Sequence, residues 1–135
     1  MDKIFPHHIY KFEVPNYQNL NKKLISEIYD LKSKKPYGMV RSNEGGWHSN
    51  ITNTKFKEFQ KIICNYYTQK ILKTNKDIEV SSIWANVNGK NHYNSIHEHP
   101  RSHYSGVYYV KVPKDIENLY LINYNTSLTH PFNYF

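Results

Sequence analysis

Residues 80–89 read Val-Ser-Ser-Ile-Trp-Ala-Asn-Val-Asn-Gly, and this stretch decides the class of fold that we expect. Its apolar residues at 83, 85 and 87 alternate with residues of other kinds at 84, 86 and 88. A period of two is typical of a β-strand, because successive side chains point to opposite faces of a sheet. The Asn88-Gly89 pair favours a tight reversal of the chain. We therefore predict a strand over Val80–Asn88 that ends in a hairpin turn.

Three more strands are predicted downstream of this turn, and one is predicted near the N-terminus. The downstream segments are rich in Val, Tyr and Ile. Pro100 and Pro113 bound two of them, since proline cannot donate to a strand ladder. The predicted strands are Ile9–Val14, Val80–Asn88, Tyr93–His99, Tyr104–Val112 and Leu119–Tyr124.

Between residues 16 and 72 the apolar pattern takes a helical period. Leu20, Leu24 and Ile28 lie on one helical face and predict a helix over Asn16–Lys32, and a similar pattern predicts a second helix over Thr54–Leu72. The Gly-rich segment 36–53 between them is expected to be a loop, in which the histidine at 48 is a candidate to line a pocket. Helices followed by consecutive strands indicate an α+β fold, with the helices backing an antiparallel sheet.

The length and composition limit the class of protein. The chain has 135 residues, so we expect a single domain over 1–135. No run of about 18 uncharged apolar residues is present, which argues against a membrane protein. The N-terminal residues lack the apolar core of a secretory signal, and Cys64 is the single cysteine, which excludes a disulfide scaffold. These features predict a small cytoplasmic protein.

The formal net charge of +7 permits a second interpretation, a non-catalytic module that binds single-stranded nucleic acid. Its aromatic residues would stack on bases and its lysines would contact phosphates. However, Asn, Lys, Ile and Tyr are all encoded by A/T-rich codons, and Lys outnumbers Arg by 16 to 2, so a biased genome explains both excesses. The lysines also concentrate on the predicted helices rather than on a strand face. Nucleic-acid binding is therefore the less favoured interpretation.

The densest group of potential metal ligands lies in residues 94–100, Asn-Ser-Ile-His-Glu-His-Pro. His97 and His99 are two residues apart, so on a strand their side chains would share a face, with about 6–7 Å between Cβ atoms. Two imidazoles at that spacing can converge on one metal ion, with nitrogen–metal distances of about 2.0–2.1 Å. Glu98 would point to the opposite face. The pattern suits a two-histidine metal site, and two ordinary polar histidines are the alternative.

Two segments resemble a family of 2-oxoglutarate- and Fe(II)-dependent oxygenases that is common in marine phage and bacteria. Residues 41–49, Arg-Ser-Asn-Glu-Gly-Gly-Trp-His-Ser, are similar to a Gly-Gly-Trp segment of that family. The second segment runs from Trp84 to Pro113, and it contains His97-Glu-His-Pro100 followed by Ser105-Gly-Val-Tyr-Tyr-Val110. The similar segments occur in the family's order along nearly the whole chain.

The resemblance implies a double-stranded β-helix, the cupin-like jelly roll, supported by two N-terminal helices. It implies that His97 and His99 bind Fe(II), with His99 at the position where most such oxygenases carry a carboxylate. 2-Oxoglutarate and O₂ would occupy the open metal positions and yield succinate, CO₂ and a hydroxylated product of unknown identity. Histidine-rich ligation also admits Zn, Ni or Co. By their place in the motif, the residues expected to line the cofactor site are Asn86, Tyr93, Asn94, Ser105 and Tyr108.

The same resemblance predicts that this chain is the N-terminal part of an oxygenase-like jelly roll. The family's distal histidine and its 2-oxoglutarate-anchoring basic residue lie in a later segment without a counterpart here. His130 is a candidate for the third ligand, although its surroundings differ from that segment. A jelly roll needs about eight strands, more than the sequence predicts. We therefore expect uncovered strand edges, and with them self-association or a complementing C-terminal chain.

Overall fold

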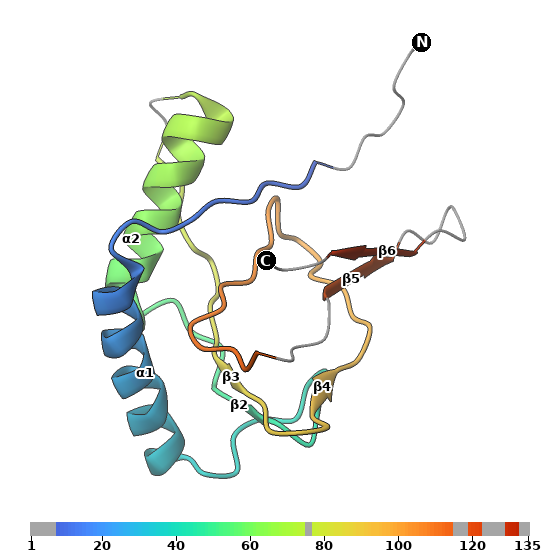
Figure 1. The fold of residues 1–135 in the computed structure, drawn as a ribbon. Coiled ribbons are helices and arrows are strands. Elements are labelled where there is room, and N and C mark those ends of the chain that lie inside the picture. The colour runs from blue at the N-terminus through green and yellow to red at the C-terminus, as the bar shows by residue number, and fades with distance from the viewer. Residues whose placement is uncertain (1–7, 75–76, 115–118, 123–128, 133–135) are drawn as a thin grey trace. The chain divides into compact units, whose positions relative to one another are not determined.

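The computed structural model describes residues 8–74, 77–114, 119–122 and 129–132 (Figure 1). The chain groups into two compact units, Met1–Ser105 and Gly106–Phe135. Among the described residues, the larger unit holds the helices and the strands β1 to β4, and the smaller unit holds β5 and β6. Neither described helix is long and apolar enough to cross a membrane.

Helix α1 spans Tyr17–Lys34 and confirms the first predicted helix. Leu20, Leu24 and Ile28 are its buried residues, as the four-residue spacing of the apolar positions requires. Two lysines occupy the last turn, where positive charge is favourable near the exposed carbonyl groups. The amide of Lys35 ends the helix by donating to the Leu31 carbonyl at 3.1 Å.

Helix α2 spans Lys57–Tyr66 and continues without a break as the π-helix η1, Tyr67–Leu72. The predicted helix began at Thr54, but Phe56 has a φ of 57°, a left-handed conformation that interrupts a right-handed helix. The buried Gln60 donates to the carbonyls of Asn53 (3.0 Å) and Lys55 (2.6 Å), and so holds the turn before the helix. A salt bridge of 2.8 Å between Lys23 and Glu58 joins the start of α2 to α1, and Figure 1 shows α2 beginning near the N-terminal end of α1.

The strands of the larger unit form one interrupted antiparallel ribbon between residues 42–52 and 83–95. β1 (Asn43–Glu44) pairs with β4 (Tyr93–Asn94), and β2 (Trp47–His48) pairs with β3 (Asn86–Val87). A bridge between Thr52 and Ile83 continues the ribbon. The segment expected to be a loop thus supplies the partner for the predicted strands. Those strands are shorter than predicted, because pairing is confined to these few positions.

The predicted turn after Asn88 is present, but it does not join two strands of one hairpin. The His92 amide donates to the Gly89 carbonyl at 3.2 Å, whereas the flanking strands β3 and β4 pair with β2 and β1. Residues 88–92 therefore bulge out opposite Gly45 and Gly46. A Cβ atom on Gly46 would lie 2.0 Å from the Asn88 side-chain oxygen, so a larger residue here would require the Asn88 side chain to move.

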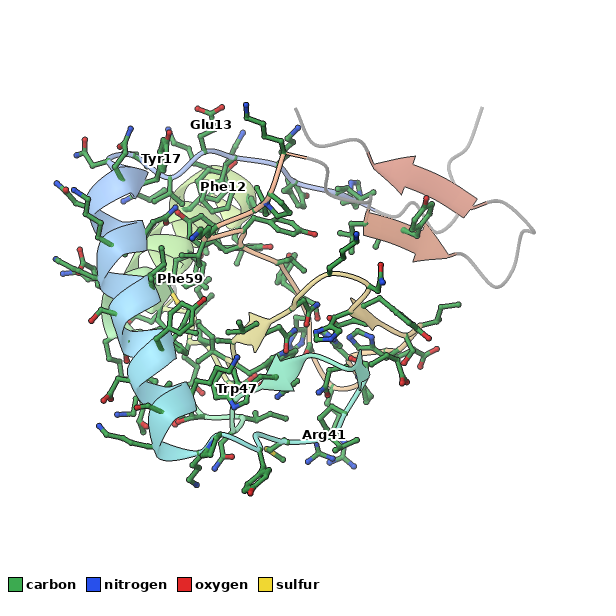
Figure 2. The ribbon with its side chains drawn as sticks, turned by 60° about the horizontal axis from the view of Figure 1, so that its bottom comes forward. Phe12, Glu13, Tyr17, Arg41, Trp47 and Phe59 are labelled. Atoms are coloured by element: carbon green, nitrogen blue, oxygen red, sulfur yellow. The ribbon has the colours of Figure 1, made fainter. Side chains whose placement is uncertain are left out.

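The core of the larger unit lies between α1 and the ribbon. Trp47 is 6% exposed and its indole nitrogen donates to the Lys35 carbonyl at 2.9 Å. Figure 2 shows this side chain beside the C-terminal half of α1. The other buried apolar residues of the described part are Val14, Leu20, Leu24, Ile28, Phe56 and Ala85. The burial of Ala85 fits the predicted alternation along 83–87.

Two predicted strands are wrong. Residues 9–14 are neither helix nor strand, and within them Phe12 stacks on Tyr66 at the end of α2, with ring centroids 3.6 Å apart. Residues 104–112 also have no strand assignment, although Val and Tyr favour one there. β-propensity alone does not form a strand, since strands are stabilised by their cross-strand partners.

In the smaller unit, β5 (Leu119–Ile122) pairs antiparallel with β6 (Thr129–Phe132). β5 confirms the predicted strand as far as Ile122, and the last two predicted positions lie outside the described residues. Mixed helices and short antiparallel strands are compatible with the predicted α+β class. The described strands pair two by two, whereas a jelly roll has two larger sheets.

We expect Gly38→Ala to lower the free energy of unfolding by about 2 kcal/mol. Gly38 has a φ of +60°, and a Cβ atom there would lie 2.6 Å from the His48 carbonyl oxygen and 2.7 Å from the Trp47 ring. Urea unfolding followed by circular dichroism measures the change. Gly106→Ala is the matched control, because a Cβ atom there meets nothing within 4 Å and its stability should barely change. Equal stability of the two variants would contradict this account of Gly38.

Candidate metal centre

His97 and His99 lie just after β4 and their rings are neighbours. The ring centroids are 4.9 Å apart and the ring planes are tilted by 36°. The prediction that the two rings lie side by side is confirmed. The prediction that they share a strand is wrong, because β4 ends at Asn94 and residues 95–99 have no ladder partner that would make them a strand.

The separation of the two rings fits a single metal ion. A nitrogen–metal distance of about 2.1 Å puts the ion about 3.2 Å from each imidazole centroid, so two imidazoles at about 90–110° have centroids about 4.5–5.2 Å apart. The observed 4.9 Å falls within that range. The separation of the rings is therefore compatible with two nitrogen ligands on one ion.

The His97 ring is oriented by a hydrogen bond to the backbone. Its Nδ1 lies 2.7 Å from the Ser95 carbonyl oxygen, so Nδ1 donates this bond and Nε2 takes no part in it. Ser95 is itself fixed to the ribbon, since its amide (2.7 Å) and its hydroxyl (3.1 Å) both donate to the Ser42 carbonyl. A backbone carbonyl on the second ring nitrogen is the usual support of a metal-binding histidine.

The His99 ring is half-buried and lies against Trp84. Its centroid is 5.2 Å from that of Trp84, at an interplanar angle of 72°, which is an edge-to-face contact. Burial lowers the pKa of His99, and the neighbouring His97 lowers it further. Both effects favour the neutral imidazole at pH 7, which is the form that binds metal.

His48 is 3% exposed and is a second neighbour of the Trp84 ring. Its ring is stacked on the Trp84 ring, with centroids 5.7 Å apart and planes 12° from parallel. Its Nδ1 lies 2.5 Å from the Ser49 carbonyl oxygen. Burial lowers the pKa of His48, the hydrogen bond to Ser49 opposes this, and the charges of Arg41 and His97 add to the lowering.

The lowered pKa of His48 predicts how stability depends on pH. A depressed pKa means that the unfolded chain binds more protons than the folded one, so the free energy of unfolding falls as the pH drops below about 6.5. We expect a plateau above about pH 7, and a smaller acid loss in His48→Gln than in the wild type. Urea unfolding from pH 5 to 8 gives both curves. Parallel curves for the two proteins would rule out His48 as a source of this dependence.

The residues predicted to line the cofactor site differ in exposure and in their hydrogen bonds. Asn86 is exposed and pairs with His48 across the ribbon, and Tyr93 is exposed opposite Glu44. The half-buried Asn94 is engaged within the protein: its Nδ2 donates to the Ser42 hydroxyl at 3.2 Å, and its Oδ1 accepts from Asn88 at 3.1 Å.

The remaining two of these residues lie near the division of the chain. Ser105 is exposed and is the last residue of the larger unit, while Tyr108 is half-buried in the smaller unit. Their role at a cofactor site stays a prediction.

A third protein ligand is not found in the described part of the chain. There, no group of three or more His, Cys, Asp or Glu side chains is arranged to hold a metal ion. Glu98 and His103 are exposed, and the Nδ1 of His92 accepts a hydrogen bond from the Gly89 amide at 3.0 Å. His130 belongs to β6, and its side chain lies outside the described residues.

No local pattern in the sequence marks Trp84 as a residue of the site or joins His48 to the histidine pair. His48 and Trp84 are far apart in the sequence, and only the pairing of β2 with β3 brings them together. The alternation along residues 83–88 places Trp84 and Asn86 on one strand face, which is a partial indication of this contact. The sequence does not show that the segment containing His48 is the partner of that strand.

Comparison with known proteins agrees in part with the resemblance seen in the sequence. Residues 82–133 match the model of a family described as "Putative 2OG-Fe(II) oxygenase". The matched region contains Trp84, both histidines of the pair and His130, whereas the Gly-Gly-Trp segment lies before it. No curated protein and no solved structure matches the chain. This region is therefore similar to a family of oxygenases, for which Fe(II) and 2-oxoglutarate are the cofactors at family level.

Proposed function

We propose that this chain carries the metal-binding part of a 2-oxoglutarate- and Fe(II)-dependent oxygenase, in which His97 and His99 bind the metal. The observation that carries the proposal is the separation of 4.9 Å between the two imidazole centroids, inside the region that matches the oxygenase family. The hydrogen bond from His97 to Ser95 adds to it, because it leaves Nε2 available for a metal.

The chemistry of this donor set fits the cofactors. Imidazole nitrogen binds Fe(II), and two protein nitrogens leave positions open for the oxygens of 2-oxoglutarate and for O₂. When bound, these groups supply the oxidation that inserts oxygen into a C–H bond of the substrate and releases succinate and CO₂. The protein supplies the fixed imidazoles and the polar groups around them.

The chain's own residues have separate roles in this proposal. His97 is oriented by the Ser95 carbonyl, and neutral His99 is favoured by its partial burial. Asn86 and Tyr93 have exposed side chains and would donate hydrogen bonds to the bound acid. Asn94 already bonds Ser42 and Asn88, so it would hold the ribbon beside the site. Ser105 and Tyr108 complete the proposed lining.

Further parts of the site would come from side chains outside those that the structure describes. The third ligand and the cation that anchors 2-oxoglutarate would be supplied by residues such as His130 or by a second chain. In the proposed jelly roll, the ribbon formed by residues 42–52 and 83–95 would be one edge of a larger sheet. Self-association through strand edges is part of the same proposal.

An anaerobic titration tests the proposed function. We expect the chain to bind one Fe(II), to bind 2-oxoglutarate only when the metal is present, and to form succinate slowly once air is admitted. Slow turnover is expected because two histidines hold the metal less firmly than three ligands do. A chain that binds no metal, or that binds 2-oxoglutarate equally well without metal, would overturn the proposal. Tight binding of a labelled single-stranded oligonucleotide by such a metal-free chain would favour the nucleic-acid module.

A further inference from the structure

We propose that Trp84, backed by the buried His48, is a positioning residue that orients the His99 imidazole for metal binding. This inference rests on the proposed function, since it assigns a role to residues next to the proposed ligands. Neither Trp84 nor His48 needs to touch the metal in this arrangement. Both would act through the contact between Trp84 and His99.

The four rings form a continuous series. His48 lies parallel to Trp84 at 5.7 Å and 12°, and the Trp84 ring meets His99 edge-to-face at 5.2 Å and 72°. His99 in turn lies 4.9 Å from His97. Edge-to-face and stacked contacts of this kind stabilise a pair of rings beyond the burial of their area. The series therefore links a buried ring of the ribbon to the exposed end of the histidine pair.

The ribbon explains why Trp84 reaches His48. Between the pairs His48–Asn86 and Thr52–Ile83, the first strand of the ribbon has three residues, 49–51, and the second strand has two, 84–85. The first strand therefore carries one extra residue. Such a β-bulge bends the strand and redirects its side chains. Trp84 and Asn86 share a face, so Trp84 is the diagonal cross-strand neighbour of His48.

The bulge is held by buried hydrogen bonds. The amide of Ser49 donates to the Ala85 carbonyl at 2.9 Å, and the amide of Ala85 donates to the Ser49 hydroxyl at 3.0 Å. Both Ser49 and Ala85 are buried. The backbone that carries Trp84 is thus fixed on both sides of the ribbon, which makes Trp84 a firm support for a less restrained neighbour.

His99 is that neighbour. His97 is restrained by its hydrogen bond to Ser95, whereas the His99 ring lies against the rings of Trp84 and His97. An imidazole free to change rotamer must be ordered when the metal binds, and that ordering weakens binding. The Trp84 contact supplies the orientation beforehand.

The test measures Ni²⁺ binding to the full chain by calorimetry. Trp84→Leu is expected to weaken Ni²⁺ binding about 10-fold, the loss typical of a missing outer-shell partner. Trp84→Phe keeps an aromatic edge and should recover most of the affinity. His48→Ala should weaken binding several-fold, while His48→Phe should restore it, because the stack and not the His48 nitrogen is proposed to matter. Tyr37→Leu, which alters an aromatic side chain that is 97% exposed, is the matched control.

A second readout separates positioning from general stability. In the metal-free wild type and in Trp84→Phe, proton NMR should show contacts between the ring at position 84 and the His99 ring. Circular dichroism shows whether each variant is folded. If Trp84→Leu does not fold, the NMR contact in the wild type decides alone, and its absence overturns the inference.

The outcomes distinguish the inference from the proposed function. If the wild type and Trp84→Leu bind Ni²⁺ equally well while His99→Ala does not, the positioning role is wrong and the proposed metal site stands. If the wild type binds no Ni²⁺ at all, both fail. A His48→Phe variant that loses as much affinity as His48→Ala would also overturn the stacking account.

Discussion

Replacing His97 or His99 by alanine is expected to weaken the binding of a single divalent transition metal about 100-fold or more, and replacing both should abolish it. The expected loss is larger than the 10- to 100-fold that outer-shell partners contribute, because each change removes a ligand itself. Calorimetric titration with Ni²⁺ or, under anaerobic conditions, with Fe(II) gives the affinity and the stoichiometry. The affinity for the metal should fall as the pH is lowered below neutral, because protonated imidazole does not bind metal.

His103→Ala is the control for this experiment. His103 is exposed and lies close to the pair in sequence, so it tests whether any nearby histidine contributes. We expect its metal affinity to match that of the wild type. If the double variant still binds one ion per chain with unchanged affinity, the metal is held elsewhere and the role of the histidine pair is wrong.

Trp47→Ala is expected to lower the free energy of unfolding by about 3–5 kcal/mol. Trp47 is 6% exposed, so its removal leaves a cavity between α1 and the ribbon, and it also removes the donor to the Lys35 carbonyl. Domains are commonly stable by about 5–15 kcal/mol, so this single change would remove a large share of the total. Urea unfolding at pH 7.5, followed by circular dichroism, measures it.

Tyr37→Ala controls for the loss of an aromatic side chain as such. Tyr37 is 97% exposed, and we expect its replacement to change the free energy of unfolding by less than about 0.5 kcal/mol. A Trp47→Ala variant that is as stable as Tyr37→Ala would mean that Trp47 is not part of the core.

The sequence determined both helices almost to their ends. The burial of Leu20, Leu24 and Ile28 follows from their four-residue spacing, which is local information. The predicted start of the second helix at Thr54 was wrong for a local reason as well. The backbone at Phe56 is left-handed, and the apolar periodicity does not reveal this.

The strands depended on information that is not local. The alternation at 83–87 correctly put Ala85 on the buried side, but the length of each strand was set by its partner in the Gly-rich segment 43–48. That segment has no strand pattern of its own. Glycine at 45 and 46 allows the close approach of His92 and Asn88, so a composition typical of loops here serves a paired ribbon.

In the candidate site, too, some features follow from the local sequence and others only from the tertiary structure. The two-residue spacing of His97 and His99 was enough to predict neighbouring rings, because it depends only on adjacent positions of one segment. The support of that pair was decided by the tertiary structure alone. Ser42, 53 residues away in sequence from Ser95, fixes the carbonyl that orients His97, and the pairing of β2 with β3 brings His48 onto Trp84. Contacts between distant segments are set by packing and register, and a single sequence carries no local pattern for them.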